Sequence, residues 1–349
     1  MKVLLVSPLP PPAGGIATWT VKYRDYCAIH NIPLVIVNNA VYGSRAKQIN
    51  TKRNVLDEVR RTSRVLSEMC CKMRKEKPDV IHLNSSCSRY GIYRDCICAI
   101  IGRVCAVPVV LQCHCNIQDQ VHGRFAAFAF KVMAALSQRV LVLNRFSADY
   151  VCKIAGSKVK VVPNFIDVKD IVGQRKIADT VKQVIFVGHV QREKGVIEII
   201  QAAKRFPDVQ FTLVGPVHQE IEKIERSGNV VLLGNQTHEQ VIQLLNEADV
   251  FLFPSYTEGF ANALLEAMTA GLPVIATDVG ANAEMIENDG GIIIPVGDSN
   301  ALVSAIAELN EDPDRRLCMS NWNTKKVCDT YLLDTIMKRF MDVYIEVVM

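Results

Sequence analysis

Short runs of aliphatic and β-branched residues alternate along the chain with longer segments that have helical spacing of apolar residues. In the first half these runs occupy residues 3–7, 34–38, 80–83, 109–113, 140–143 and 158–162. In the second half they occupy residues 184–187, 210–214, 230–232, 250–254, 274–277 and 291–294. Continuous apolar strands that alternate with helices are typical of parallel sheets covered on both faces, so the pattern predicts an α/β fold.

The strand runs form two series, which predict two doubly wound, Rossmann-like domains. A length of 349 residues fits two domains, at roughly 100–200 residues each. Polar residues separate the series between positions 163 and 182, so we expect one domain over residues 1–165 and a second over residues 183–330. We also expect a central cleft between the domains, because sheets of this kind bind ligands at the carboxyl ends of their strands.

The composition, 49% hydrophobic and 22% charged, is typical of a folded soluble protein and excludes disorder, collagen and coiled coil. The apolar run at residues 3–6 is too short for a secretory signal. Residues 96–111 are the best candidate for a membrane span, but Gly102, Arg103 and Pro108 interrupt them. We therefore expect a cytoplasmic protein whose 12 cysteines are reduced.

The tripeptide Cys113-His114-Cys115 combines residue types that bind metals. Neighbouring residues on a strand point to opposite faces, so the two thiolates and the imidazole do not easily converge on one ion. Zinc sites also use gaps of about two to four residues between paired ligands. We expect no metal here and interpret the cysteines as small buried hydrophobic residues.

Charge is distributed unevenly between the two halves of the chain. Residues 1–170 hold 25 Lys and Arg against 11 Asp and Glu, and residues 171–349 hold 15 against 25. The first half therefore has a net charge of +14 and the second half −10. A basic half indicates either an anionic partner or a solvated surface that complements the acidic half.

Part of the positive charge lies on a predicted amphipathic helix at residues 55–74. Residues 45–77 hold 11 Lys and Arg against 4 Asp and Glu, with Arg60, Arg61 and Arg64 inside the helix. Such a helix attracts an anionic bilayer by about 1 kcal/mol for each basic residue close to the surface. The alternative is a solvated helix that packs its apolar stripe on the sheet, and the two interpretations are compatible.

The most informative stretch is residues 254–273, which follow a predicted strand and enter a helix that Gly271 and Pro273 end. The start of that helix holds Phe260, Ala261, Asn262 and Ala263. Backbone N–H groups and the positive end of the helix dipole make this start a phosphate site, and the small Ala261 permits close approach.

Two carboxylates flank this helix start. Glu266 lies in the first turns of the helix, where its two acceptor oxygens suit a ribose diol. Glu258 lies in the preceding loop, where it would accept hydrogen bonds from sugar hydroxyls. Either residue alone would be interpreted as a helix-capping or solvent-facing glutamate.

Glu258 and Glu266, with seven residues between them, resemble the signature of retaining nucleotide-sugar glycosyltransferases of the GT-B fold, family four. Further motifs in the family's order support the resemblance over nearly the whole chain. They are Gly14-Gly15 after the first strand, residues 161–167, residues 186–188 followed by Glu193-Lys194-Gly195, and residues 277–280 followed by Glu284.

The resemblance implies roles for individual residues. Lys194 would neutralise the donor diphosphate as a point charge, and Glu258 and His114 would act beside the donor sugar. Gly14 and Gly15 would let phosphate or acceptor approach the backbone. The catalytic candidates are thus Glu258, His114 and Lys194, and the donor-binding candidates are Gly14, Gly15, His189, Arg192, Lys194, Phe260, Ala261, Asn262, Ala263 and Glu266.

The chain departs from the family pattern at two positions. The family commonly has Arg where this chain has His189, and histidine is cationic only when it is protonated. Arg192 would replace the missing charge, or the diphosphate is held less tightly and turnover depends on pH. Ala281 stands where a second glycine is usual, which affects the packing of its loop.

The resemblance implies a retaining hexosyltransferase that needs no metal or other cofactor, because no Asp-x-Asp motif accompanies a strand end. The donor would be a nucleoside-diphosphate sugar, UDP more often than GDP-mannose in this family. The acceptor would be a glycan or a lipid-linked sugar in surface polysaccharide or glycolipid assembly, held by the first domain at the inner face of the plasma membrane, with no nucleic-acid partner. The family's C-terminal helix, about residues 331–349 here, packs back on that domain.

Two other functions fit the same architecture. A nucleotide-sugar 2-epimerase shares the two domains and the diphosphate site, but needs acid and base groups that the sequence does not reveal. A non-catalytic transferase subunit would bind nucleotide sugar without turnover; His189 fits that alternative, whereas Lys194, Glu258 and Glu266 together argue against it.

Overall fold

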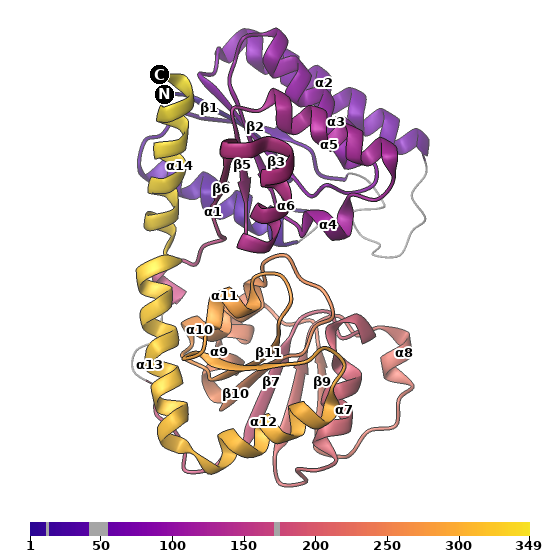
Figure 1. The fold of residues 1–349 in the computed structure, drawn as a ribbon, viewed down its shortest axis with the longest axis vertical. Coiled ribbons are helices and arrows are strands. Elements are labelled where there is room, and N and C mark those ends of the chain that lie inside the picture. Colours follow the sequence, from indigo (N-terminus) through magenta and orange to yellow (C-terminus); the bar gives the residue numbers. More distant parts are fainter. Residues whose placement is uncertain (12–13, 42–54, 171–174) are drawn as a thin grey trace. The chain divides into compact units, whose positions relative to one another are not determined.

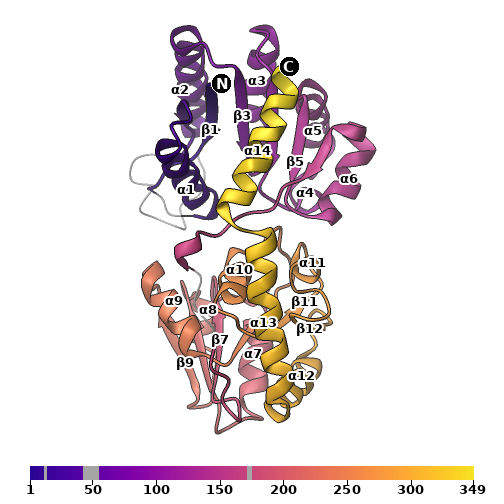
Figure 2. The same cartoon turned by 90° about the vertical axis from the view of Figure 1, so that its left-hand side faces the viewer.

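The computed structural model describes residues 1–11, 14–41, 55–170 and 175–349. Over these residues the chain forms two compact units (Figures 1 and 2). The first unit contains residues 1–164 and 336–349, and the second contains residues 165–335. Phe165, which was expected in the first domain, and the described residues of 166–182, which the sequence pattern left between the domains, thus belong to the second unit.

The first unit contains a six-stranded parallel sheet in the order β2-β1-β3-β4-β5-β6. Its strands are β1 (Val3–Ser7), β2 (Leu34–Asn38), β3 (Val80–Ser85), β4 (Val109–Cys113), β5 (Arg139–Val142) and β6 (Val159–Val161). β1, β3, β4 and most of β5 are buried, which is why their sequences are continuously apolar. The predicted α/β fold with parallel strands is confirmed.

Helices cover both faces of this first sheet. They are α1 (Gly15–Ile29), α2 (Val55–Glu76), α3 (Gly91–Val104), α4 (Ile117–Gln120), α5 (Arg124–Leu136), α6 (Arg145–Ala155), the 3₁₀ helix η2 (Gly156–Lys158) and most of α14 (Leu333–Val348). α2, α3 and α5 lie side by side on one face, and α1 and α14 lie on the other (Figure 1).

Buried aromatic and polar side chains join α14 to the first sheet. Burial lowers the pKa of His82 to about 3, so its imidazole is neutral. Its Nε2 donates to Gln112 Oε1 over 2.9 Å, which leaves Nδ1 to accept from the Tyr344 hydroxyl. The Tyr344 oxygen accepts in turn from Tyr23 over 2.9 Å. Every buried hydroxyl in this chain of bonds is therefore satisfied, and α14 is fixed in the core.

The second unit also contains a six-stranded parallel sheet, in the order β12-β11-β10-β7-β8-β9. Its strands are β7 (Gln183–Val187), β8 (Gln210–Val214), β9 (Val230–Gly234), β10 (Val250–Phe253), β11 (Val274–Thr277) and β12 (Gly291–Ile294). β7, β8 and β9 follow one another toward one edge of the sheet, and β10, β11 and β12 follow one another toward the other edge. The boundary between β7 and β10 is therefore a topological switch point, where α/β sheets bind ligands.

Two groups of helices cover the second sheet, with α7 and α12 packed together on one face and α9, α10 and α13 on the other. The α-helices are α7 (Val196–Ala203), α8 (Gln219–Glu222), α9 (His238–Glu247), α10 (Asn262–Thr269), α11 (Asn282–Ile286), α12 (Ser299–Glu311) and α13 (Pro313–Thr330). The 3₁₀ helices are η3 (Val168–Asp170) and η4 (Arg192–Lys194).

α13 ends at Thr330 and α14 begins at Leu333, close to residue 331, where the C-terminal helix was expected to begin. Between them, Ile166 N–H donates to Tyr331 O and Leu333 N–H donates to Ile166 O, each over 2.9 Å. These bonds take backbone groups that a continuous helix would use internally. The apolar spacing of α13 and α14 does not identify Ile166 as the partner of these backbone groups, because Ile166 is far away in the sequence.

The described residues include no helix that is both long and apolar enough to cross a bilayer. The part of the basic stretch that carries Arg45, Lys47, Lys52 and Arg53 lies outside the described residues.

Candidate active site

The candidate residues of the second unit meet where β7 and β10 end. These strands are neighbours in the sheet, and both are parallel, so their carboxyl ends fall at the same edge. The loop after β7 carries His189, Arg192 and Lys194, and the loop after β10 carries Glu258. The topology of the sheet therefore brings together residues that are more than 60 positions apart.

Gly195 fixes how closely the two loops approach. Its φ is +71°, and a Cβ atom built on it would lie 2.0 Å from the Pro254 carbonyl oxygen. Both the left-handed conformation and the close contact exclude a larger residue. Gly195 thus holds η4 directly against the end of β10.

The outcome of this close approach is an ion pair between Lys194 and Glu258. Lys194 Nζ lies 2.5 Å from Glu258 Oε1. The two side chains are only 22% and 12% exposed, so solvent screens them less than a surface pair. The sequence motifs gave each residue a separate role, and the structure shows that each is the other's counterion.

A third loop, after β11, supports Glu258 from the other side. Gly280 has φ +59°, and a Cβ on it would lie 2.2 Å from the Glu258 carbonyl oxygen. The next residue, Ala281, is buried and its N–H donates to Gly259 O over 3.1 Å. The alanine at the position where the family usually has a second glycine therefore fits, because the close contact falls on Gly280.

α10 begins beside this loop, with Ala261 as its N-cap residue and Asn262 and Ala263 in its first turn. No side chain caps this end of the helix. The Phe260 ring packs against Tyr331, with ring centroids 5.8 Å apart. Phe260 was predicted to bind the donor. Its ring packs against the core and anchors the loop. Only the backbone of Phe260 is therefore placed to contribute at the start of α10.

Glu266 lies one turn into α10, where Oε1 is 3.8 Å from His238 Nδ1. His238 is the first residue of α9, so the histidine and the carboxylate face each other at the starts of two neighbouring helices. The sequence motifs do not identify His238, because nothing in its spacing relates it to Glu266.

His189 and Arg192 are both exposed in the loop after β7. The His189 ring lies 6.0 Å from the ring of His218. Desolvation, followed by the charges of His218 and Lys194, lowers the pKa of His189 below its usual 6.5. His189 is therefore largely neutral at neutral pH, unlike the arginine that is common at this position.

Tyr256 and Glu198 form a second contact between the same two loops, which the sequence motifs missed. The Tyr256 hydroxyl donates to Glu198 Oε1 over 2.8 Å, and this bond raises the pKa of Tyr256. Tyr256 N–H also donates to Glu193 O over 3.0 Å. The loop after β10 is thus held to η4 and to α7 by hydrogen bonds as well as by the ion pair.

The candidates of the first unit lie at the carboxyl edge of its own sheet. Gly14 is the N-cap of α1, and a Cβ there would meet no atom within 4 Å. One turn later, the Trp19 ring lies edge-on to His114 at 5.2 Å. Burial lowers the pKa of His114 to about 3, and its Nε2 has no hydrogen-bond partner among the described residues. His114 is thus a neutral ring at this edge, close to the helix that Gly14 and Gly15 begin, and its Nε2 is buried and unpartnered in the part of the chain that the structure describes.

The cysteines beside His114 converge on a third thiol. Cys87 hydrogen-bonds to Cys113 and Cys115, which lowers the pKa of the Cys87 thiol against the effect of burial. Cys113 is the last residue of β4, and His114 and Cys115 lie in the loop that follows it. Over the described residues, no group of three His, Cys, Asp or Glu has the arrangement that holds a metal.

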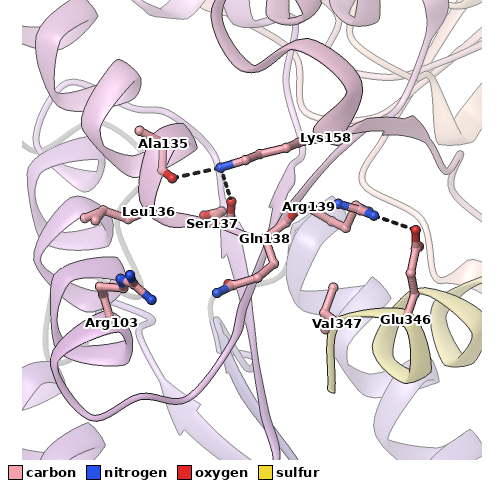
Figure 3. Close-up of a pocket in the computed structure, with 9 residues that line it drawn as sticks. All are labelled: Arg103, Ala135, Leu136, Ser137, Gln138, Arg139, Lys158, Glu346 and Val347. Carbon is pink, nitrogen blue, oxygen red and sulfur yellow. Dashed lines mark hydrogen bonds and ion pairs between the residues drawn. The ribbon is translucent and has the colours of Figure 1, made fainter. Parts of the chain in front are cut away.

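A polar cavity of about 440 Å³ lies at the opposite edge of the first sheet, where strands begin (Figure 3). Lys158 Nζ donates there to the carbonyls of Ala135 and Ser137, over 2.9 and 3.1 Å, and so caps the end of α5. Arg139 pairs with Glu346 of α14. Lys158, Arg139 and Glu346 thus join helices to the sheet at this cavity, and none of the candidate residues lines it.

Two family models match consecutive parts of the chain. Residues 51–170 match the model described as Glycosyltransferase Family 4, and residues 167–326 match the model described as Glycosyl transferases group 1. The chain belongs to the family-four-like glycosyltransferases of the GT-B fold.

Named relatives of this glycosyltransferase are identical to it at about a quarter of the aligned residues. The TuaC protein of Bacillus subtilis, named for teichuronic acid biosynthesis, is 26% identical over 265 residues, which are 72% of this chain and 65% of TuaC. An Escherichia coli α-1,3-galactosyltransferase named for UDP-Gal and α-D-GlcNAc-diphosphoundecaprenol is 23% identical over 307 residues, 79% of this chain and 77% of the relative.

Among solved structures, sucrose-phosphate synthase from Thermosynechococcus elongatus superposes with a TM-score of 0.78 at 18% identity. The match covers 99% of this glycosyltransferase and 98% of the synthase. At that level of identity the likeness shows the shared fold.

The contact between Gly195 and Pro254 predicts that Gly195→Ala destabilises the glycosyltransferase by about 2 kcal/mol, since alanine meets both an unfavourable φ and a backbone oxygen. Urea unfolding monitored by circular dichroism measures the change. Gly228→Ala is the matched control in the same unit, because a Cβ there has open space. Equal stability of the two variants would contradict the packing described for η4.

Proposed function

We propose that this chain is a retaining hexosyltransferase that moves a sugar from a UDP-sugar to an acceptor in the assembly of a surface polysaccharide or glycolipid. The observation that carries the proposal is the Lys194–Glu258 ion pair at the switch point, beside the start of α10. The names of two relatives support these substrate classes. TuaC is named for teichuronic acid biosynthesis, and the Escherichia coli galactosyltransferase is named for UDP-Gal and α-D-GlcNAc-diphosphoundecaprenol.

In this proposal the donor diphosphate takes Lys194 from Glu258. A diphosphate is a stronger partner for an ammonium group than a single carboxylate, because it carries more charge and more acceptor oxygens. The N–H groups at the start of α10 and the exposed Arg192 would bind the remaining phosphate oxygens. The site thus holds its cation in place before the donor arrives.

Release of Lys194 leaves the carboxylate of Glu258 to accept hydrogen bonds from the donor sugar. Glu266 would bind the ribose hydroxyls from α10. Both carboxylates then face hydroxyl groups and not the phosphates, which avoids repulsion between like charges. His114 would contact the sugar or the acceptor. Its ring is neutral, and its Nε2 has no hydrogen-bond partner among the described residues.

For the chemical step we propose that the leaving phosphate oxygen helps to deprotonate the acceptor on the same face of the sugar, through an oxocarbenium-like state. The protein then contributes orientation and charge stabilisation. Lys194, Arg192 and the start of α10 would supply the positive charge that a metal ion supplies in other transferases.

The acceptor in this proposal is a lipid-linked sugar or glycan at the inner face of the plasma membrane, bound by the basic first unit. Gly14 leaves the start of α1 open, and α1 carries no acidic residue in its first turn. An acceptor diphosphate would meet no local repulsion there.

Removal of the Lys194 charge should weaken the donor complex. We expect Lys194→Ala to raise the dissociation constant of a UDP-sugar by about tenfold or more, the effect of losing one charge-assisted hydrogen bond. Calorimetric titration with UDP-glucose, UDP-galactose and GDP-mannose, without metal, measures this. Lys204→Ala, an exposed lysine of the same unit, is the control.

Unchanged affinity in Lys194→Ala would exclude the diphosphate site. Epimerised donor in a wild-type sample without acceptor would instead favour the nucleotide-sugar 2-epimerase.

The lowered pKa of His189 predicts that donor affinity depends on pH. Above about pH 6.5 the ring is neutral, and protonation at lower pH adds a positive charge near the diphosphate, so affinity should rise several-fold from about pH 7.5 to about pH 5.5. UDP-glucose is the suitable ligand because its diphosphate does not titrate in this range. His189→Arg should bind more tightly at neutral pH with a flatter profile, and His30→Arg is the control.

A profile that is equally steep in His189→Arg would contradict the role of His189 in the pH dependence.

A further inference from the structure

The outward sides of α2, α3 and α5 form one continuous face of the first unit. The three helices pack side by side over the sheet, α2 against α3 and α3 against α5 (Figure 1). α1 and α14 cover the opposite side of the sheet. We use the term basic apolar face for the exposed residues of α2, α3 and α5.

The exposed positions of α3 are apolar along its length, except for one arginine near its end. They are Tyr93, Ile97, Ile100, Arg103 and Val104. Their spacing of three or four residues puts the apolar members in one stripe that runs the length of the helix. Val104 is 79% exposed, although this stripe has the composition of a buried surface.

α5 extends the apolar stripe with two phenylalanines. Phe125 is 81% exposed and Phe128 is 68% exposed, one turn apart on the same side of the helix. The other exposed residues of α5 are Arg124, Lys131 and Ala135. Contiguous aromatic and aliphatic side chains of this size mark an interaction surface and are unusual on a monomer's free surface.

α2 adds further apolar and basic residues. Val59 is 56% exposed, and Arg60, Arg64, Arg74 and Lys75 are exposed around it or further along the helix. Three basic side chains of α2 donate to backbone carbonyls in or just after β2, which explains part of the basic pattern of this helix. They are Arg61, bonded to Asn39 O, Arg64, bonded to Ala40 O, and Lys72, bonded to Ile36 O. Arg64 stays exposed while it makes this bond, whereas Arg61 and Lys72 are half-buried.

No acidic residue is exposed on these three described helices. Asp95 is buried, Glu58 pairs with Arg61, and Glu68 pairs with Lys72. The exposed charged residues of the basic apolar face are therefore all basic, and its other exposed residues are apolar or small and uncharged.

We propose that the basic apolar face is the surface by which this protein docks on an anionic lipid bilayer. Apolar side chains enter the boundary between headgroups and acyl chains, and arginine and lysine pair with anionic headgroups. A second copy of the chain is a poorer occupant, because a two-fold dimer through this face would place positive charge against positive charge.

The inference rests on the proposed function, since a lipid-linked acceptor requires a membrane. α3 begins at Gly91, shortly after β3 ends, so the face starts at the same sheet edge as His114 and the open start of α1. Docking through this face would bring the headgroup layer next to that edge. The helix at residues 55–74 would then contribute one side of the docking surface, and α3 and α5 its apolar centre.

Vesicle sedimentation of the full chain tests the docking surface. The vesicles contain phosphatidylcholine alone or mixed with phosphatidylglycerol. We expect the wild type to bind the anionic vesicles, more weakly as salt rises. The triple variant Ile97→Ser, Phe125→Ser and Phe128→Ser should lose at least about tenfold in affinity. The matched control replaces Ile293, Val296 and Leu317, which are exposed to 38–43% in the second unit, with serine and should bind like the wild type.

Equal vesicle binding by the wild type and the triple variant would overturn the docking surface. So would a wild-type dimer in light scattering that the triple variant converts to a monomer. Thermal midpoints should match, because the replaced side chains are exposed. UDP-glucose binding is measured on the same variants. It should stay unchanged, because the replaced residues lie outside the proposed donor site. Failure of the docking surface and failure of the donor site can therefore be distinguished.

Discussion

The polarity of the parallel sheet is the constraint on which the arrangement of the second unit depends. The sheet grows in two directions from the boundary of β7 and β10, so two loops that are distant in sequence leave the same edge side by side. Gly195 lets these loops touch at the Pro254 carbonyl, and Gly280 does the same at Glu258. Together the two close contacts fix the carboxylate of Glu258 against Lys194.

This geometry balances the charges of the site. A half-buried lysine without a counterion would be costly, and Glu258 supplies that counterion within the protein. The proposed donor replaces it with phosphate and leaves Glu258 for the sugar. His189, largely neutral in place of a permanent arginine charge, makes the same exchange sensitive to pH. The proposed chemistry therefore depends on an exchange of partners at one lysine.

The sequence predicted the strands, the parallel fold and the residues at the sheet edges, because apolar runs and glycine-containing loops are local signals. It did not predict contacts that depend on distant backbone groups. The backbone of Ile166 bonds to Tyr331 and Leu333 between α13 and α14, and the convergence of Cys113 and Cys115 on Cys87 follows from the pairing of β3 with β4. Likewise, counting the charged residues of α2 does not show that Arg61 and Lys72 bond to backbone carbonyls.

The most direct test of the partner exchange is the affinity of Glu258→Gln for UDP at constant pH. Glutamine keeps the size of the side chain and removes the charge that competes for Lys194. The account predicts that this variant binds UDP more tightly than the wild type, because the diphosphate no longer displaces a carboxylate. Weaker or equal binding of UDP by Glu258→Gln would contradict it.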